Sequence, residues 1–246
     1  MREKILSAFI LLLFNFSIRT FAQSNQAITD KLSIITSLTV NDSYVQLPED
    51  SILRKYLKIE LIKEEDFQAK QKTAINHLLA DTGKIRKKKG VLRLPLATGS
   101  KTLVDKLVDN DGRQEYEYLG QITFLNAYLV RCLFWEVMEY RLISKKNGTT
   151  ISTFSAMPYI SADKKKIMTA YADPYENDSE IAVYSITGNK INNTILARFK
   201  NWMPGNEEKI FWGADGKLYL PVQFSDQFWN TDGNLNTNFF YLRINL

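Results

Sequence analysis

The chain has very little of the two residue types on which much enzyme and metal chemistry depends. Its 246 residues include one cysteine, Cys132, and one histidine, His77. A single cysteine excludes an intrachain disulfide, and the two residues together are too few for a zinc site built only from Cys and His. A Ser–His–Asp or Cys–His centre would have to use His77, and no G-x-S-x-G motif is present. The sequence therefore gives no sign of a nucleophilic catalytic centre.

Charge of one sign is also scarce. The formal net charge is +5, and the composition is 45% hydrophobic and 24% charged, which excludes a disordered, collagen-like or coiled-coil chain. The one dense basic run is Gly83–Gly90, and it contains no aromatic residue on which a base would stack. We therefore expect a solvated linker there and no nucleic-acid partner.

Only one hydrophobic run is long enough to suggest a targeting signal, and it lies at the start of the chain. Arg2 and Lys4 precede the apolar stretch Ile5–Phe16, and small residues flank Phe21 at Thr20 and Ala22. A span of about 20 residues is needed to cross a bilayer, so this stretch is too short for an anchor. The pattern predicts a signal peptide over residues 1–22, cleaved after Ala22. The expected product is periplasmic or extracellular, with no membrane span after cleavage.

Residues 23–90 are expected to form a small N-terminal α/β segment that ends in the basic linker. Leu32–Val40 and Leu57–Lys63 have the composition of strands, and Glu64–Asp81 has helical spacing. His77 lies off the apolar stripe of that helix, so we expect it to face solvent. The stripe consists of Phe67, Gln71, Ala74, Ile75 and Leu78. The sequence leaves open whether this segment packs on the rest of the chain or stands apart.

Residues 91–246 read almost entirely as strand and turn, and the absence of βα alternation argues against a Rossmann or TIM-type fold. Cys132 shares a strand face with Val130 and Phe134, which predicts a buried, unreactive thiol. Asp109–Gly112 is typical of a hairpin turn between two strands. The predicted strands are Val91–Leu96, Thr102–Val108, Gln114–Leu119, Leu125–Trp135, Val137–Ser144, Thr149–Phe154, Lys166–Ala172, Glu180–Ile186, Thr194–Trp202, Lys209–Trp212, Lys217–Phe224 and Phe239–Leu246.

Two stretches of this region look alike. Pro158–Ile167 and Ile210–Tyr219 each carry apolar residues, a small-residue turn with Ala-Asp, and then a strand; Asp163 and Asp215 are 215 − 163 = 52 residues apart. An Asp at such a position accepts backbone N–H groups of the turn.

These stretches, with the strand at Ile181–Gly188, resemble the blades of TolB-like and WD40-like β-propellers. The resemblance covers about Tyr118 to Leu246. The spacing exceeds the roughly 40–45 residues of a WD40 blade, and the repeats are too few for a closed ring. It therefore implies a mostly β fold: an irregular or partial propeller-like antiparallel sheet array. Tyr116–Gly120 and Tyr140–Ile143 also resemble segments of exported β-rich bacterial proteins of no assigned activity, a resemblance that implies no catalytic residue.

Two sets of side chains are candidates for ligand contact. An acid-rich loop has the oxygen ligands that Ca²⁺ prefers, although the EF-hand order and its Gly are missing and a plain exposed turn is the alternative. Its candidate metal ligands are Asp173, Glu176, Asp178 and Glu180. Large aromatic rings mostly fill cores, but a few could line a groove for a sugar, a peptide or a partner protein. The candidates for that role are Trp202, Trp212, Phe228 and Trp229.

These observations favour an exported, non-catalytic, β-rich binding or protein-interaction module with a protein or glycan partner. Two alternatives remain open. One is a carbohydrate-active hydrolase that uses paired carboxylates, of which Glu115 and Glu117 share a strand face. The other is an inhibitor or immunity-type partner of a toxic enzyme.

The leader makes the first testable prediction. The protein recovered from the periplasm or the medium of an expressing bacterium should begin at Gln23, which intact-mass measurement will show. Ala22→Arg should block cleavage, because the position before the cut requires a small side chain. Recovery of the uncut chain from the cytoplasm in both cases would contradict the prediction.

Overall fold

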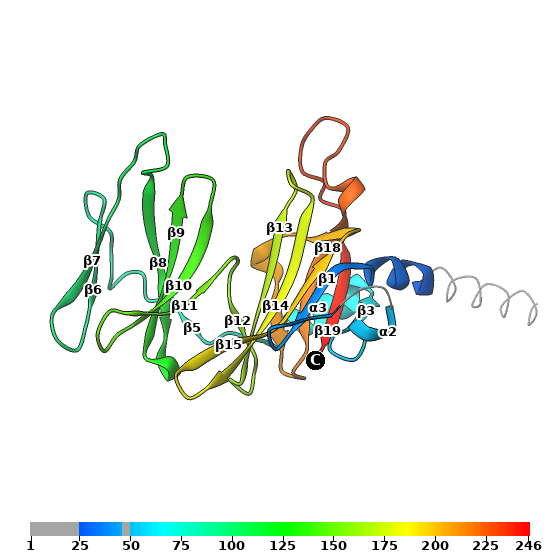
Figure 1. Cartoon of the computed structure of the whole chain (residues 1–246), viewed down its shortest axis with the longest axis horizontal. Coiled ribbons are helices and arrows are strands. Elements are labelled where there is room, and N and C mark those ends of the chain that lie inside the picture. Colours follow the sequence, from blue (N-terminus) through cyan, green and yellow to red (C-terminus); the bar gives the residue numbers. More distant parts are fainter. Residues whose placement is uncertain (1–24, 46–49) are drawn as a thin grey trace, which may run out of the picture.

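The computed structural model describes residues 25–45 and 50–246, and the predicted signal peptide lies outside them. The described chain is mostly β and antiparallel, as the sequence predicts (Figure 1). Sheet A has the order β12 (Tyr159–Ile160), β13 (Lys166–Asp173), β14 (Asp178–Thr187), β15 (Lys190–Phe199), β1 (Ile35–Val40), β2 (Ser43–Val45). Sheet B has the order β3 (Lys58–Ile62), β19 (Phe240–Asn245), β18 (Leu218–Phe224), β17 (Phe211–Gly213), β4 (Ala74–Ile75), and β16 (Trp202–Pro204) also pairs with β18.

The remaining elements extend this array. Sheet C has the order β11 (Thr150–Phe154), β10 (Met138–Ser144), β9 (Ala127–Phe134), β8 (Gln114–Ile122), β5 (Leu78–Leu79). Strands β6 (Val91–Pro95) and β7 (Ser100–Val104) form a separate hairpin. Residues 25–32 are helical, and the short helices α2 (Asp50–Leu53) and α3 (Glu64–Gln71) follow. Three 3₁₀ turns complete the list: η1 (Thr123–Leu125), η2 (Glu207–Lys209) and η3 (Ser225–Gln227).

The elements stack as layers along the long axis of the molecule. In Figure 1 the β6–β7 hairpin lies at one end, sheet C follows it, and sheets A and B form the other half. Sheets A and B pack face to face through a core that includes Leu38, Val183, Leu220 and Leu242. All seven residues of β18 are buried, because this central strand of sheet B is covered on both faces.

Sheet C has a cluster of buried side chains on each face. Alternate side chains of β9 point to opposite sides, so Leu129 packs towards sheet A while Val130 and Cys132 pack under the β6–β7 hairpin. Burial raises the pKa of the Cys132 thiol to about 11. The prediction that Cys132 is buried is confirmed, and the raised pKa disfavours the reactive thiolate form.

The helix predicted over Glu64–Asp81 is wrong beyond Gln71. Helix α3 ends there, and the chain then forms two short strands, with Ile75 paired to Trp212 and Leu78 paired to Ile122. Phe67 is the one α3 residue that is buried, against sheet B. Pairing with two different sheets therefore overrides the helical spacing of the sequence.

The turn predicted at Asp109–Gly112 is present, but the hairpin around it is reduced to one antiparallel bridge, in which Lys106 and Gln114 exchange both backbone hydrogen bonds. Strand β7 pairs with β6, and β8 pairs with β9 and β5, so the two flanking segments meet only at an isolated bridge between Lys106 and Gln114. The turn signal is local, whereas strand partners are chosen by packing of the whole sheet.

The described part of residues 23–90 packs on the rest of the chain through strand pairing. Strand β1 pairs with β15, β3 with β19, β4 with β17 and β5 with β8. The N-terminal segment thus contributes strands to all three large sheets and does not stand apart from them.

The two look-alike stretches form similar local hairpins. Asp163 Oδ1 accepts the backbone N–H of Lys165 at 3.0 Å, and Asp215 Oδ1 accepts that of Lys217 at 3.4 Å. The role predicted for these Asp residues is confirmed. The hairpins belong to different sheets, however, which pack face to face, and this arrangement gives no support to a propeller repeat.

Within residues 25–45 and 50–246, no helix has the length and apolar character needed to cross a membrane.

The core of the A–B sandwich makes the second prediction. The Trp202 side chain is 0% exposed, stacks near Phe199 and donates its indole N–H to the backbone carbonyl of Leu32 at 2.6 Å. Trp202→Phe should lower the free energy of unfolding by about 1–3 kcal/mol, because it leaves a cavity and an unpaired carbonyl. Denaturant unfolding measures this loss. Trp229→Phe, at a ring that is 39% exposed, is the matched control and should change stability by less than about 0.5 kcal/mol.

Candidate functional site

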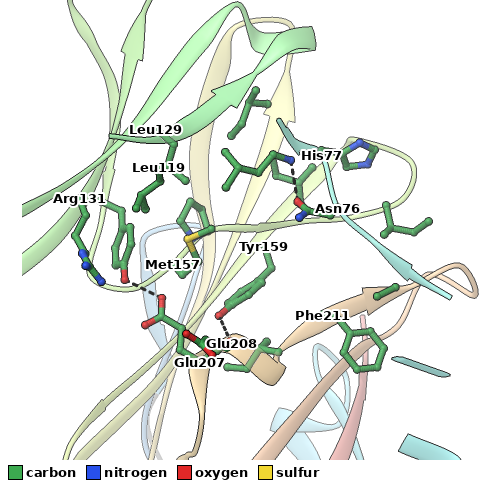
Figure 2. A pocket seen from close by; sticks show the side chains of 18 of the residues that line it. Asn76, His77, Leu119, Leu129, Arg131, Met157, Tyr159, Glu207, Glu208 and Phe211 are labelled. Atoms are coloured by element: carbon green, nitrogen blue, oxygen red, sulfur yellow. Dashed lines mark hydrogen bonds between the residues drawn. The ribbon is translucent and has the colours of Figure 1, made fainter. Parts of the chain in front are cut away.

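A cavity of about 510 Å³ lies where sheets A, B and C meet. Each sheet contributes a very short edge strand to this junction: β12 from sheet A, β4 from sheet B and β5 from sheet C. The η2 turn and the end of α3 close the remaining sides. Figure 2 shows the side chains that point into the cavity from these elements. The volume falls within the range of roughly 300–1,000 Å³ that is typical of small-molecule sites.

The walls of the cavity are mostly apolar. Sheet C supplies one wall, and the segment before β12 and strand β17 supply the others (Figure 2). The apolar side chains that line it include Leu78, Leu119, Leu129, Met157, Ile210 and Phe211.

One end of the cavity is polar and centres on Glu207. The hydroxyl of Tyr140 donates to Glu207 Oε1 at 2.8 Å, and the hydroxyl of Tyr159 donates to the Glu207 backbone carbonyl at 2.8 Å. The η2 turn that carries Glu207 begins at Asn206, whose side chain accepts the N–H of Glu208 at 2.9 Å. Glu207 is therefore held by two tyrosines from different elements, as Figure 2 shows for Tyr159 and Glu207.

Both tyrosines remain hydrogen-bond donors over a wide pH range. Burial raises the pKa of Tyr140, and the adjacent Glu207 raises it further. Burial also raises the pKa of Tyr159, with Glu207 and Tyr140 adding to the effect. Ionisation of either phenol would place a second anion beside Glu207 in a poorly solvated site.

Arg131 brings a positive charge to the same end. Its guanidinium pairs with Glu117, and its Nε is buried with no hydrogen-bond partner. Burial alone would lower the pKa of Arg131, but Glu117 and Tyr140 together more than offset that effect, so the pKa is raised. Because sheet C is pleated, Arg131 faces the cavity with Leu129, whereas Cys132 faces away.

The sequence predicts that His77 faces solvent from the surface of a helix. In the structure it lies instead at the rim of the cavity. It belongs to the link between β4 and β5, its Nε2 is 3.2 Å from the carbonyl oxygen of Ser161, and its ring meets Phe124 edge-on at 5.8 Å. The difference follows from the early end of α3.

The four aromatic candidates separate into two pairs. Trp202 and Trp212 lie in the core, 0% and 2% exposed, so neither lines a ligand groove. The indole of Trp212 donates to the carbonyl of Tyr159 at 2.8 Å and thereby positions the cavity wall. Phe228 and Trp229 lie in the loop after η3, away from the cavity-lining residues.

The four acidic candidates do not converge on a metal. Asp173 and Asp178 face each other across the β13–β14 turn, and Asp173 Oδ1 accepts the N–H groups of Tyr175 and Glu176 at 2.9 and 3.1 Å. Glu180 pairs with Arg198. Among the residues described, no group of three or more His, Cys, Asp or Glu side chains is arranged to hold an ion. The calcium hypothesis is therefore not supported, because the carboxylates already serve the turn and an ion pair.

The carboxylates proposed as a hydrolytic pair are also engaged elsewhere. Glu115 lies near Lys87 and Arg113, at 3.8 and 3.6 Å, and Glu117 pairs with Arg131.

Sequence reasoning missed the residues that form the polar end of the cavity. Tyr140, Tyr159 and Glu207 come from β10, β12 and η2, and no local motif links them. The one signal was indirect: Tyr159 and Ile210 both belong to the look-alike stretches, whose first strands border the cavity.

No protein-family model matches this chain, and no curated protein or solved structure is significantly similar to it.

Glu180 makes the third prediction, which concerns pH. Burial raises the pKa of this carboxyl despite the nearby Arg198, and Asp178 raises it further. An acid whose pKa is raised by folding stabilises the fold below its unfolded pKa, and this contribution is lost as the pH rises through the folded pKa. Glu180→Gln should therefore stabilise the protein at pH 7, by on the order of 1 kcal/mol, because the cost of burying the charge disappears.

Thermal or denaturant unfolding, at pH 7 and at a pH below the usual glutamate pKa, provides the measurement. Near pH 3.5, roughly below the usual glutamate pKa, the variant and the parent should have similar stabilities. Glu176→Gln, at an exposed acid of the same hairpin, is the control and should be neutral throughout. A loss of stability in Glu180→Gln at pH 7 would contradict the argument.

Proposed function

We propose that this chain is an exported, non-catalytic binding module that holds a small ligand in the cavity between sheets A, B and C. The observation that carries the proposal is the cavity itself, about 510 Å³ in volume, with apolar walls and the cluster of Tyr140, Tyr159, Glu207 and Arg131 at one end. An apolar pocket with a few convergent polar groups is the usual form of a ligand site.

The lining suggests the chemistry of the ligand. The apolar walls favour a largely hydrophobic body. At the polar end, the Glu207 carboxylate has more acceptor sites than its bond to Tyr140 uses, and the Arg131 guanidinium, a hydrogen-bond donor, lines the cavity. A neutral group that both donates and accepts, such as a hydroxyl or a primary amide, fits this end best. A full charge would fit less well, because charges of both signs are already present there.

A cavity-filling variant tests the proposal. The probe is N-phenyl-1-naphthylamine, a neutral apolar dye that fluoresces when it is removed from water. Leu119 is half-buried and lines the cavity, so Leu119→Trp should fill part of it and weaken dye binding about tenfold or more, equivalent to roughly 1.4 kcal/mol.

The matched control is Leu103→Trp. Leu103 is also half-buried, but it lies on β7 and packs against the cluster between the β6–β7 hairpin and sheet C, so its substitution should leave dye binding unchanged. Thermal unfolding of both variants shows whether they fold. Failure of the parent protein to bind the dye, or equal loss in both variants, would contradict the proposal.

An activity assay of the parent protein distinguishes the hydrolase alternative from the binding module. Glu207 and Glu208 are the carboxylates at the cavity, but they occupy consecutive positions on one turn. A glycosidase needs two carboxyl groups that face each other across the bond to be cleaved. Release of nitrophenol from nitrophenyl glycosides by the parent, and its loss in Glu207→Gln, would favour the enzyme over the binding module.

A further inference from the structure

A second surface lies at the far end of the A–B sandwich, away from the cavity. Two loops distant in sequence meet there: the β13–β14 turn and the long loop 225–239, which projects beyond the sheets in Figure 1. Tyr175 from the first loop lies against Trp229 from the second, with ring centroids 5.7 Å apart. Phe228 meets Trp229 edge-on at 5.6 Å. We call Tyr175, Phe228 and Trp229 the aromatic tip.

The aromatic tip contributes little to the core. Tyr175 is 85% exposed and Trp229 is 39% exposed, and neither belongs to a buried cluster. Large rings that remain in water forgo the stabilisation that their burial would provide. Clustered exposed aromatics are therefore typical of binding surfaces rather than of structural packing.

The long loop is held in a defined shape by its own hydrogen bonds. Asn230 Oδ1 accepts the N–H groups of Asp232 and Asn234 at 3.0 and 2.9 Å, and the Asn236 side chain donates to the carbonyl of Gln227 at 2.9 Å. The buried Gln223 side chain donates to the carbonyls of Asn236 and Asn238 and so anchors the loop to β18. A pre-shaped loop loses less conformational entropy on binding.

The charged residues within the two loops of the tip are all acidic. Residues 173–178 contain three acids, residues 225–239 contain two, and neither loop contains Lys or Arg. Lys31, from the helical segment 25–32, is a nearby cation and lies 3.7 Å from Asp226. The net negative charge of the two loops repels phosphate, anionic lipid and nucleic acid, and it attracts cations. Aromatic faces bind cations as well, Trp most strongly.

We propose that the aromatic tip is a docking surface for an arginine-bearing segment of a partner protein. A guanidinium stacks on the rings of Trp229 and Tyr175, while the carboxylates of Glu176 and Asp232 remain available for ion pairs at the rim. Arginine fits this surface better than lysine because its planar group both stacks on rings and pairs with carboxylates.

The probe is a fluorescein-labelled peptide of alternating glycine and arginine, with fluorescence anisotropy as the readout. The parent protein should bind it, more weakly as salt is raised. The double variant Tyr175→Ala with Trp229→Ala should weaken binding about tenfold, and Asp232→Asn about threefold. Tyr44→Ala is the matched control, because Tyr44 is an exposed tyrosine (63%) on β2, and it should bind the peptide as the parent does.

Several outcomes would overturn the proposal: no binding by the parent, equal binding of a glycine–glutamate peptide, or undiminished binding by a folded double variant. Binding of a neutral oligosaccharide at the tip in place of the peptide would point to a glycan instead. The double variant should retain dye binding in the cavity, so failure here is distinguishable from failure of the proposed ligand site.

Discussion

The segment around β12 is the constraint on which the cavity depends. Strand β12 itself is only two residues long, yet hydrogen bonds from several elements hold the segment around it. It pairs with β13, the indole of Trp212 binds the carbonyl of Tyr159, the hydroxyl of Tyr159 binds the carbonyl of Glu207, and His77 lies against the carbonyl of Ser161. Each contact reaches a different element, so the segment that borders the cavity is held in place from four directions.

Short edge strands explain why a cavity persists at this junction. A long edge would offer a row of unpaired backbone groups for further pairing. Here β4, β5 and β12 are each two residues long, so each exposes only a few such groups. Gly120 allows the closest of these approaches. Its φ is +147°, and a Cβ there would lie 2.5 Å from the carbonyl oxygen of Leu79, so a larger residue would push β5 away from β8.

The sequence predicts the strands well where alternation and turn residues agree, and less well where partners decide the outcome. From Val91 onward, the predicted strand Lys217–Phe224 matches β18 closely, whereas Thr102–Val108 and Thr194–Trp202 each run several residues past the ends of β7 and β15. The helical stripe that continues to Leu78 fails because β4 and β5 find partners in sheets whose other strands are far along the chain. Residue type does not separate the buried Trp202 and Trp212 from Trp229, and the one local sign of exposure at Trp229 is its place in a long polar loop. The sequence does not predict the polar end of the cavity, because Arg131, Tyr140 and Glu207 come from separate elements and share no motif.

The two proposed surfaces differ in the way the fold supports them. The cavity exists only while sheet C stays docked on sheet A, since its apolar walls come from both halves of the molecule. The aromatic tip needs only the A–B sandwich and the hydrogen bonds of its own loops. Partial opening of the C–A junction would therefore empty the cavity and leave the tip intact. Burial and the adjacent Glu207 raise the pKa values of Tyr140 and Tyr159, so both phenols remain hydrogen-bond donors at the polar end of the cavity.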